Sequence, residues 1–215
     1  DAPVPTPRLE RVVSSADRSE AVAAGGLVVV EGAGLSPVTV ATSQLPLPTA
    51  LGESCLTVNG VLVPLISLSA TRIQAQLPLR IVGNATLLLR TPAASSNQLG
   101  ITIQSAAPSV FRSGVAGPQT GLATIYRASN GQLVTASNPV HPEEAIVIYA
   151  TGMGRTWPLV EAGLAAPADP LATVTLQPEV ALGGVALPVL YAGLVPGLVG
   201  VYQVNATLPA WVPVG

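Results

Sequence analysis

The chain has 215 residues, with nine Arg, no Lys and eleven Asp or Glu, so its net charge is −2. So few cations, with a pI near 5.3, cannot form the clustered Lys and Arg that hold nucleic-acid phosphates or an anionic membrane surface. Both classes of partner are excluded, and the length suits two β-domains of roughly 100 residues each.

The composition is unusually apolar, with 49% hydrophobic residues and a mean hydropathy of +0.56. Two interpretations stay open, because a soluble protein normally carries more surface charge. Part of the apolar surface contacts another protein, or small residues such as Ala, Gly, Ser and Thr cover the outside. Residues 180–215 hold no acidic or basic side chain, but Pro188, Pro196 and several glycines interrupt any membrane helix. We therefore expect no membrane-spanning segment.

The first residues predict an extended arm followed by a strand. Residues 1–8 place proline at every second position from the third, which favours a polyproline-like arm. Residues 9–24 fit a helix, or a short strand at 9–13 followed by a polar loop, and we favour the strand. The chain begins at Asp1 without methionine, so we expect a processed product.

The rest of the chain predicts short strands separated by Gly and Pro turns. Asn-Gly at 59–60 and at 130–131 predicts two hairpins, because both residues tolerate positive φ. No segment combines a sustained 3.6-residue apolar period with helix caps, so helix content should be small. The fold class we predict is all-β, with immunoglobulin-like β-sandwiches in tandem. The predicted strands include residues 27–30, 56–58, 85–89, 99–103, 145–149 and 174–176.

An internal repeat supports the tandem arrangement. Residues 60–64 read Gly-Val-Leu-Val-Pro and are followed at 74–78 by Gln-Ala-Gln-Leu-Pro. Residues 184–188 read Gly-Val-Ala-Leu-Pro and are followed by Gln203 and then Leu-Pro at 208–209. We therefore expect two similar domains.

The expected domain boundaries are 1–8 for the arm, 9–106 for the first sandwich and 107–215 for the second. After Pro78 the first copy continues through two more strand-like runs, whereas the second copy ends at Gly215. The second sandwich should therefore lack its last two strands and expose unpaired backbone groups and an apolar groove. Three explanations stay open: a longer polypeptide, a strand supplied by another subunit, or a rearranged complete fold.

The residue types that catalysis or metal binding needs are scarce. Cys55 is the single cysteine, which excludes an internal disulfide and suits a small core residue. His141 is the single histidine and lies in a turn, without a Gly-x-Ser-x-Gly elbow anywhere. A zinc site needs more Cys and His ligands than the two that this chain has, and a calcium site needs carboxylates that are more closely spaced than those of this chain. Glu143 and Glu144 would point to opposite faces of a strand. We predict no enzyme, cofactor or metal.

Aromatic residues offer the one candidate site. Every aromatic residue lies after position 110. Trp157 and Trp211 each lie beside a proline-containing turn, where they are candidates for stacking on a sugar ring. Contact with the core or with a protein partner is the more common role of tryptophan. The aromatic residues are Phe111, Tyr126, Tyr149, Trp157, Tyr191, Tyr202 and Trp211.

Several blocks resemble one family, the Solibacter-type C-terminal domain. They are residues 148–154, 163–171 and 191–205, of which the last is the most specific, with 58–64 and 74–78 in the first half. The resemblance covers nearly all of residues 9–215. It implies a protein secreted or surface-attached in Acidobacteria or related bacteria, with immunoglobulin-like sandwiches and no catalytic residues to carry over. The chain departs from the family in lacking a large preceding domain and the closing strands.

Two functions follow as hypotheses. The first is a non-enzymatic extracellular structural or adhesive protein of a bacterium, which associates with itself or another surface protein, as in a filament built by strand complementation. The alternative is a carbohydrate-binding or accessory module that uses Trp157 or Trp211 to hold a polysaccharide.

Overall fold

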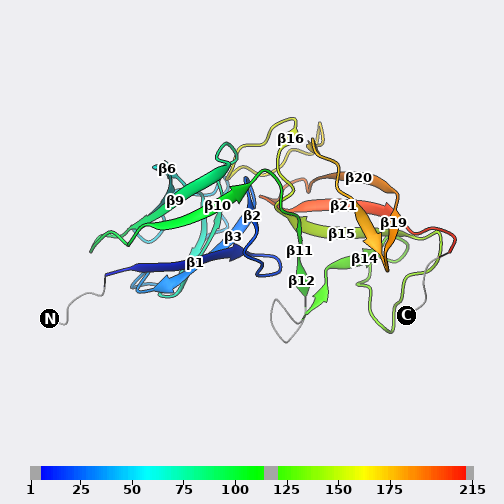
Figure 1. Ribbon diagram of the computed structural model, residues 1–215, viewed down its shortest axis with the longest axis horizontal. Helices are drawn as coiled ribbons and strands as arrows, with labels where there is room; N and C mark the ends of the chain where they lie inside the picture. Colours follow the sequence, from blue (N-terminus) through cyan, green and yellow to red (C-terminus); the bar gives the residue numbers. More distant parts are fainter. Residues whose placement is uncertain (1–5, 114–120, 212–215) are drawn as a thin grey trace.

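The computed structural model describes residues 6–113 and 121–211, and every helix or strand element within them is a strand. The predicted all-β class and the low helix content are therefore confirmed for this part of the chain. No described segment forms a helix that would be long and apolar enough to cross a membrane. The chain forms two lobes side by side, the first coloured blue to green and the second green to red (Figure 1). We call residues 6–104 the first lobe and residues 109–211 the second lobe.

The first lobe consists of two five-stranded sheets. One sheet has the order β1 (Arg8–Ser14), β3 (Leu27–Ala33), β8 (Arg72–Gln76), β7 (Leu65–Leu68) and β4 (Val40–Ala41). The other has the order β2 (Val22–Ala23), β10 (Leu99–Gln104), β9 (Gly83–Arg90), β5 (Cys55–Val58) and β6 (Val61–Leu62). The strand predicted at residues 9–13 is thus confirmed as part of β1, and the helical alternative is wrong. Residues 1–5 of the predicted arm lie outside the described residues.

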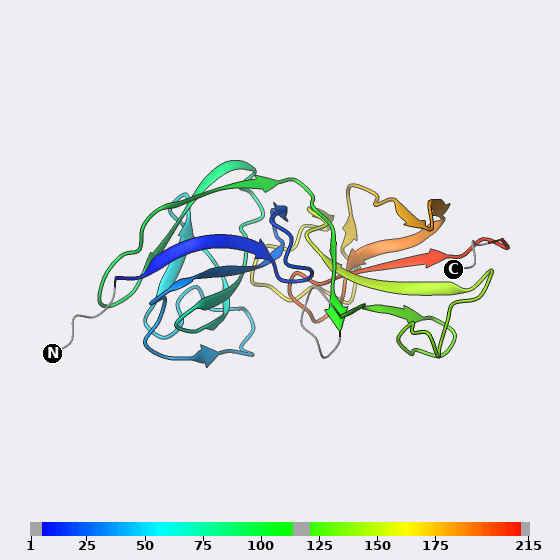
Figure 2. The same cartoon turned by 60° about the horizontal axis from the view of Figure 1, so that its bottom comes forward.

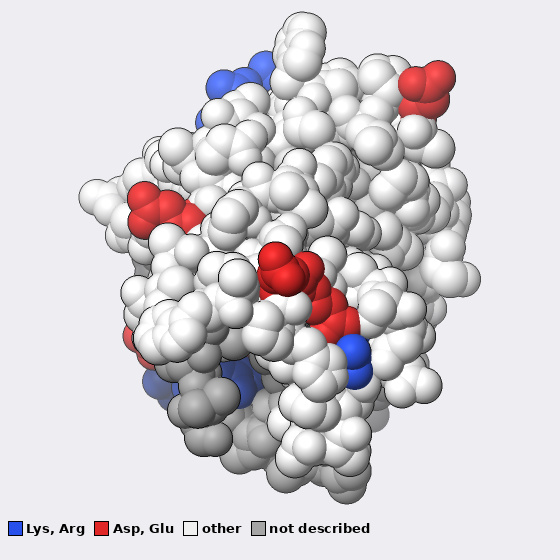
Figure 3. Space-filling model, turned by 90° about the vertical axis from the view of Figure 1, so that its right-hand side faces the viewer, with Lys and Arg blue, Asp and Glu red and all other residues white. Residues whose placement is uncertain are grey.

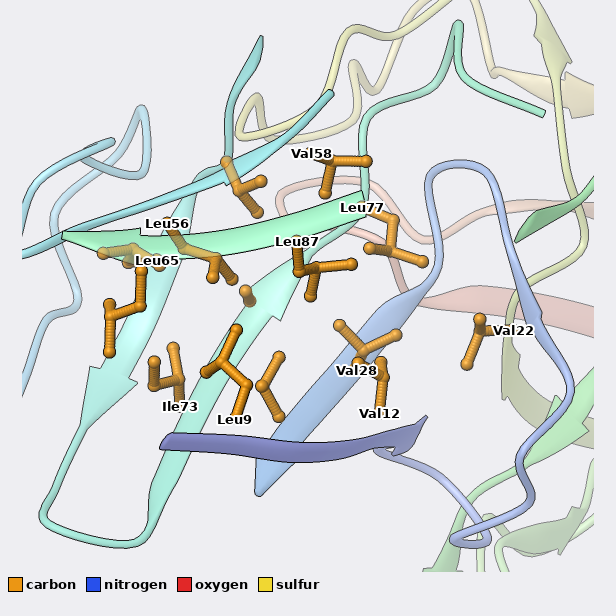
Figure 4. Close-up of a cluster of buried hydrophobic side chains, with 14 of the residues drawn as sticks. Leu9, Val12, Val22, Val28, Leu56, Val58, Leu65, Ile73, Leu77 and Leu87 are labelled. Atoms are coloured by element: carbon orange, nitrogen blue, oxygen red, sulfur yellow. The ribbon is translucent and has the colours of Figure 1, made fainter. Parts of the chain in front are cut away.

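Alternating side chains from the two sheets form the core of this lobe (Figure 4). Val28 and Ile73 come from one sheet, whereas Leu56 and Leu87 come from the other, and each is at most 1% exposed. Side chains at every second position of a strand share one face, so each sheet buries one apolar face against the other. This packing is that of a β-sandwich. The predicted hairpin at Asn59 and Gly60 is also confirmed, with φ of 49° and 80° at its two turn residues.

The second lobe is built on one seven-stranded sheet (Figure 2). Two short strands, β11 (Ser109–Val110) and β14 (Ile125–Arg127), pair with successive parts of β15 (Ala145–Thr151). The order then continues through β21 (Tyr202–Thr207), β20 (Val189–Leu194), β17 (Thr173–Val174) and β16 (Thr156–Trp157). Two strand pairs stand apart from this sheet: β12 (Arg112–Ser113) with β13 (Leu122–Ala123), and the hairpin of β18 (Val180–Leu182) with β19 (Val185–Leu187).

The strands of the second lobe follow the order of the first. β3 and β15 are flanked by β8 and β21, which pair in turn with β7 and β20. The β18–β19 hairpin carries the repeated Gly-Val-x-x-Pro segment at residues 184–188, and the counterpart at 60–64 covers the turn into β6 and β6 itself. β5 also pairs with β9, whereas β18 pairs with β19 alone among the described strands. The second hairpin predicted, at Asn130 and Gly131, is realised only as a turn with a single bridge between Tyr126 and Leu133.

The described residues of the second lobe, 109–113 and 121–211, leave no apolar groove over its sheet, so that expectation is wrong for them. The inner face of the sheet is buried, with Ile148 the most exposed of its central residues at 7%. Val180 and Leu187 of the β18–β19 hairpin pack against this face, as do Val140 and Val160 from the connections. Hairpin and connections therefore cover the core that a second full sheet would otherwise bury. The unpaired edge of β18 remains.

Thr151 is a buried side chain that joins the two lobes. It lies at the end of β15 and is 1% exposed. Its Oγ1 accepts a hydrogen bond from the Leu27 N–H of the first lobe at 2.9 Å and donates one to the Gly200 carbonyl at 2.7 Å. A Cβ on Gly200, whose φ is +65°, would lie 2.9 Å from Leu27 Cγ. Backbone of the second lobe therefore approaches the first lobe as closely as glycine permits.

Gln76 makes the matching bridge from the first lobe. Its side chain is at the end of β8, and the residue is 6% exposed. The amide Nε2 donates to the Gly25 carbonyl at 2.9 Å, and Oε1 accepts from the Gly163 N–H at 2.6 Å. The Leu47 N–H donates to the Gly163 carbonyl at 2.9 Å. Both polar groups of the Gly163 backbone thus have partners in the first lobe, which holds the two lobes at one orientation.

Replacement of Thr151 by Val is expected to lower the free energy of unfolding by about 1–3 kcal/mol, because it leaves a buried N–H and a buried carbonyl without partners at nearly constant volume. Urea denaturation followed by circular dichroism measures the change. The control is Thr102→Val on the exposed side of β10, which we expect to change stability by less than about 0.5 kcal/mol. Equal effects of the two variants would contradict the bridge.

Candidate functional site

The two tryptophans predicted as contact residues are exposed but lie far apart. Trp157 is on β16 with 76% of its surface exposed, and Trp211 is 73% exposed. The strand register places Trp157 level with Gln203, at the start of β21, whereas Trp211 follows the end of that strand. The structure therefore does not bring the two tryptophans together into one site.

The register of the seven-stranded sheet does place Trp157 with other aromatic side chains. We define the outer face as the face of this sheet opposite the core. Directly paired residues point to the same face of a sheet. One row across the outer face therefore joins β16 to β15, and it consists of Trp157, Thr173, Gly193, Gln203 and Tyr149.

A second row lies beside the first. Tyr191 pairs with Asn205, Asn205 with Val147, and Val147 with Tyr126. The rings of Tyr126 and Tyr149 meet edge to face, with centroids 5.7 Å apart and planes at 81°. The outer face therefore carries Trp157 at one edge and a tyrosine pair at the other.

The centre of the outer face carries Gly193, Tyr191 and two amide side chains. A Cβ on Gly193 would lie 2.4 Å from Tyr191 Oη and 2.8 Å from Cζ, so the tyrosine ring lies over this glycine. Burial raises the pKa of Tyr191, and its hydroxyl remains a hydrogen-bond donor at neutral pH. Gln203 Nε2 donates to Asn205 Oδ1 at 2.8 Å. Gln203 Oε1 and Asn205 Nδ2 have no partner within the described part of the chain, so one acceptor and one donor are free.

A hollow with a volume of about 500 Å³ lies at the tyrosine edge of the outer face, which is within the size range of small-molecule sites. Its lining residues are Tyr126, Arg127, Ala128, Gly131, Val147 and Tyr149.

A cluster around Glu144 shapes the loops beside this hollow. Arg127 Nε donates to both carboxylate oxygens of Glu144 at 2.8 and 3.0 Å, and Arg127 Nη1 donates to Asn138 at 2.8 Å. The Ser129 hydroxyl and the His141 N–H also donate to this carboxylate. The Ser129 hydrogen bond, with the Arg127 guanidinium second, lowers the pKa of Glu144 to about 2. Because this carboxylate is fully engaged, it holds the loops and is not available as an acid or base.

Charged side chains are sparse around the second lobe. Most of the surface is uncharged on the side of the molecule seen in Figure 3. Arg155 lies opposite Thr175 at the Trp157 edge, where the Thr175 N–H donates to the Arg155 carbonyl. Arg155 is the charged residue at this edge, and the two rows themselves consist of aromatic, hydroxyl and amide side chains with Val147 and Gly193.

The residues weighed for catalysis and metal binding do not converge. His141 is exposed, and its backbone N–H, not its ring, contacts Glu144. Cys55 is half-buried on β5 and lines a hollow of about 460 Å³ on the first lobe. Within residues 6–113 and 121–211, no group of three or more His, Cys, Asp and Glu side chains is placed to hold a metal ion.

No protein-family model matches the sequence, and the comparison with curated proteins finds no similar one. The resemblance of residues 191–205 to the Solibacter-type domain therefore stays a prediction.

Sequence reasoning identified Trp157 but not its neighbours on the outer face. The strands predicted at 145–149 and 174–176 contain Tyr149 but neither Thr173 nor Gln203. Only the alternation along each strand gave a signal, because it separates Val147 and Tyr149 from the buried Ile146 and Ile148. Which strands are neighbours, and in what register, cannot be read from that alternation.

Replacement of Glu144 by Gln tests the cluster through its pH dependence. The pKa of this carboxyl is about 2 when folded, against an ordinary 4.5. Its contribution to stability is therefore fully present above about pH 5 and is lost as the pH falls from 4.5 towards 2. Wild type should be more stable than Glu144→Gln at pH 7, and the gap in urea midpoints should close towards pH 2. Glu143→Gln, an exposed neighbour, should show no such gap. A gap independent of pH would refute the assignment.

Proposed function

We propose that this chain is a non-enzymatic extracellular structural or adhesive protein of a bacterium. The observation that carries the proposal is the junction, where Gln76 and Thr151 each hydrogen-bond backbone of both lobes while almost fully buried. An enzyme needs groups free to act on a substrate, whereas an adhesive or structural unit needs a fixed shape and an exposed binding face. A junction of buried hydrogen bonds supplies a fixed shape.

The chemistry of the exposed groups supports the same conclusion. Glu144 and Glu31 each form ion pairs with arginine side chains. Burial alone would raise the pKa of Glu31, but hydrogen bonds from Arg18 and Arg11 outweigh it and lower the pKa. Both carboxylates therefore serve to hold the fold together. The resemblance to secreted bacterial domains and the low charge support an extracellular location.

Adhesion of coated beads tests the proposal. Beads that carry the chain should be retained on at least one of four surfaces, namely cellulose, chitin, peptidoglycan, or a layer of the chain itself. Beads coated with the heat-denatured chain provide the control. If the folded chain gives no more retention than the denatured chain on any of these surfaces, the adhesive role is wrong.

Self-association through β18 is a second candidate, favoured by the free edge of that strand. The turn residues Gly183 and Gly184 have φ of 57° and 82° and connect the pair Leu182 and Val185. The pair that flanks a two-residue turn exchanges both hydrogen bonds, so the next pair, Ala181 and Ala186, does not. The Ala181 N–H and carbonyl therefore point away from the hairpin, where an extended strand of a second copy can pair with them.

Replacement of Ala181 by Pro tests this edge, because it removes an outward donor without removing a hairpin hydrogen bond. We expect light scattering after size-exclusion chromatography to show concentration-dependent oligomers for wild type and a several-fold weaker association for Ala181→Pro. Ala186→Pro is the matched comparison, since it removes the outward donor of the β19 edge, and an equal or greater loss of association in this variant would contradict pairing through β18. A wild-type chain that is monomeric at all concentrations contradicts this candidate.

A further inference from the structure

We infer that the outer face of the seven-stranded sheet binds a neutral polysaccharide chain that runs across the strands. This inference rests on the proposed adhesive function and names the ligand of the second lobe. It concerns one row of residues, from Trp157 on β16 to Tyr149 on β15, together with the second row beside it.

The aromatic rings of the outer face suit a sugar better than a protein strand. The ring of a pyranose has an apolar C–H face and a rim of hydroxyl groups, so it stacks on an aromatic ring while its hydroxyls stay hydrated or bonded. Trp157 offers such a ring with 76% exposure, and Tyr191 offers one that lies over Gly193. Tyr149 and Tyr126 offer a third surface at the far edge.

Between these rings stand the polar groups that sugar hydroxyls need. Gln203 Oε1 is an unpaired acceptor and Asn205 Nδ2 an unpaired donor within the described residues, and their mutual hydrogen bond holds both amides in place. The hydroxyl of Thr173 already donates a hydrogen bond to the Trp157 carbonyl at 3.3 Å. A fixed donor and acceptor in the middle of an apolar strip match a hydroxyl-rich ligand and would leave a purely apolar partner with unmet hydrogen bonds.

The spacing of the strands matches the repeat of the ligand. Neighbouring strands lie about 4.8 Å apart, which is close to the length of one sugar ring in an extended chain. The row crosses β16, β17, β20, β21 and β15 in turn. A polysaccharide that crosses the strands therefore places about one ring over each of them, and about five rings fill the row.

The charge of the outer face selects for a neutral chain. Apart from Arg155 at one edge, its rows contain no acidic or basic side chain, and Arg127 next to the hollow is neutralised by Glu144. A uronic acid chain would leave most of its carboxylates without a cation. The hollow beside Tyr126 and Tyr149 is wide enough to receive a branch or the end of the chain.

Binding of defined oligosaccharides tests the inference. Cello-, laminari-, manno- and xylo-oligosaccharides, from disaccharide to hexasaccharide, are titrated into the intact chain by isothermal calorimetry, with oligogalacturonate as the acidic comparison. We expect at least one neutral series to bind, with affinity rising with length up to about five rings. Affinity that does not change with length would overturn the cross-strand arrangement, and preference for oligogalacturonate would overturn the neutral class.

Variants locate the site. Trp157→Ala should weaken binding at least about tenfold, the value expected for loss of one stacking ring, while Trp157→Phe retains most of it. Trp211→Ala is the matched control, because Trp211 is equally exposed but lies beyond the end of β21, outside the paired rows. If Trp157→Ala binds as wild type does, the inference is wrong. If no oligosaccharide binds while coated beads still adhere to a layer of the chain, the inference fails and the adhesive function stands.

Discussion

The junction between the lobes is the constraint on which the rest of the molecule depends. Thr151 and Gln76 stand at the ends of β15 and β8, in corresponding sheets of the two lobes, and each joins backbone groups of both. Backbone groups buried at such a junction can no longer form hydrogen bonds with water, so each must find a partner within the protein. One hydroxyl and one amide supply these partners. The orientation of the second lobe, and hence of its outer face, follows from this arrangement.

In the seven-stranded sheet, alternate residues of each strand point to the core and to the exposed outer face. Ile146 and Ile148 point inward to the core, while Val147 and Tyr149, one position along, point outward. The corresponding sheet of the first lobe carries charged side chains on its outer face, where Glu31 forms ion pairs with Arg11, Arg18 and Arg72. Similar strand orders thus present a charged face in one lobe and an aromatic, amide-rich face in the other.

Much of the fold was predictable because its signals are local. The β-branched runs at 27–30 and 145–149, and the Asn-Gly turn at 59–60, depend on residues next to one another, and each was found where expected. The apolar groove of the second lobe was predicted wrongly, since it was inferred from strands that the repeat lacks. Val140, Val160 and the β18–β19 hairpin cover the core instead, and nothing local marks them for that role.

The sequence by itself determined the all-β class, the scarcity of charge and the gathering of aromatic residues in the second half, because composition and short-range periodicity carry this information. Only the tertiary structure decided that Trp157 shares a face with Gln203 and Tyr149, and that Trp211 lies beyond the paired strands. It likewise decided that Gln76 and Thr151 meet the backbone of the other lobe. The physical reason is that strand order and register join residues far apart in the chain, and no local pattern specifies which strands become neighbours.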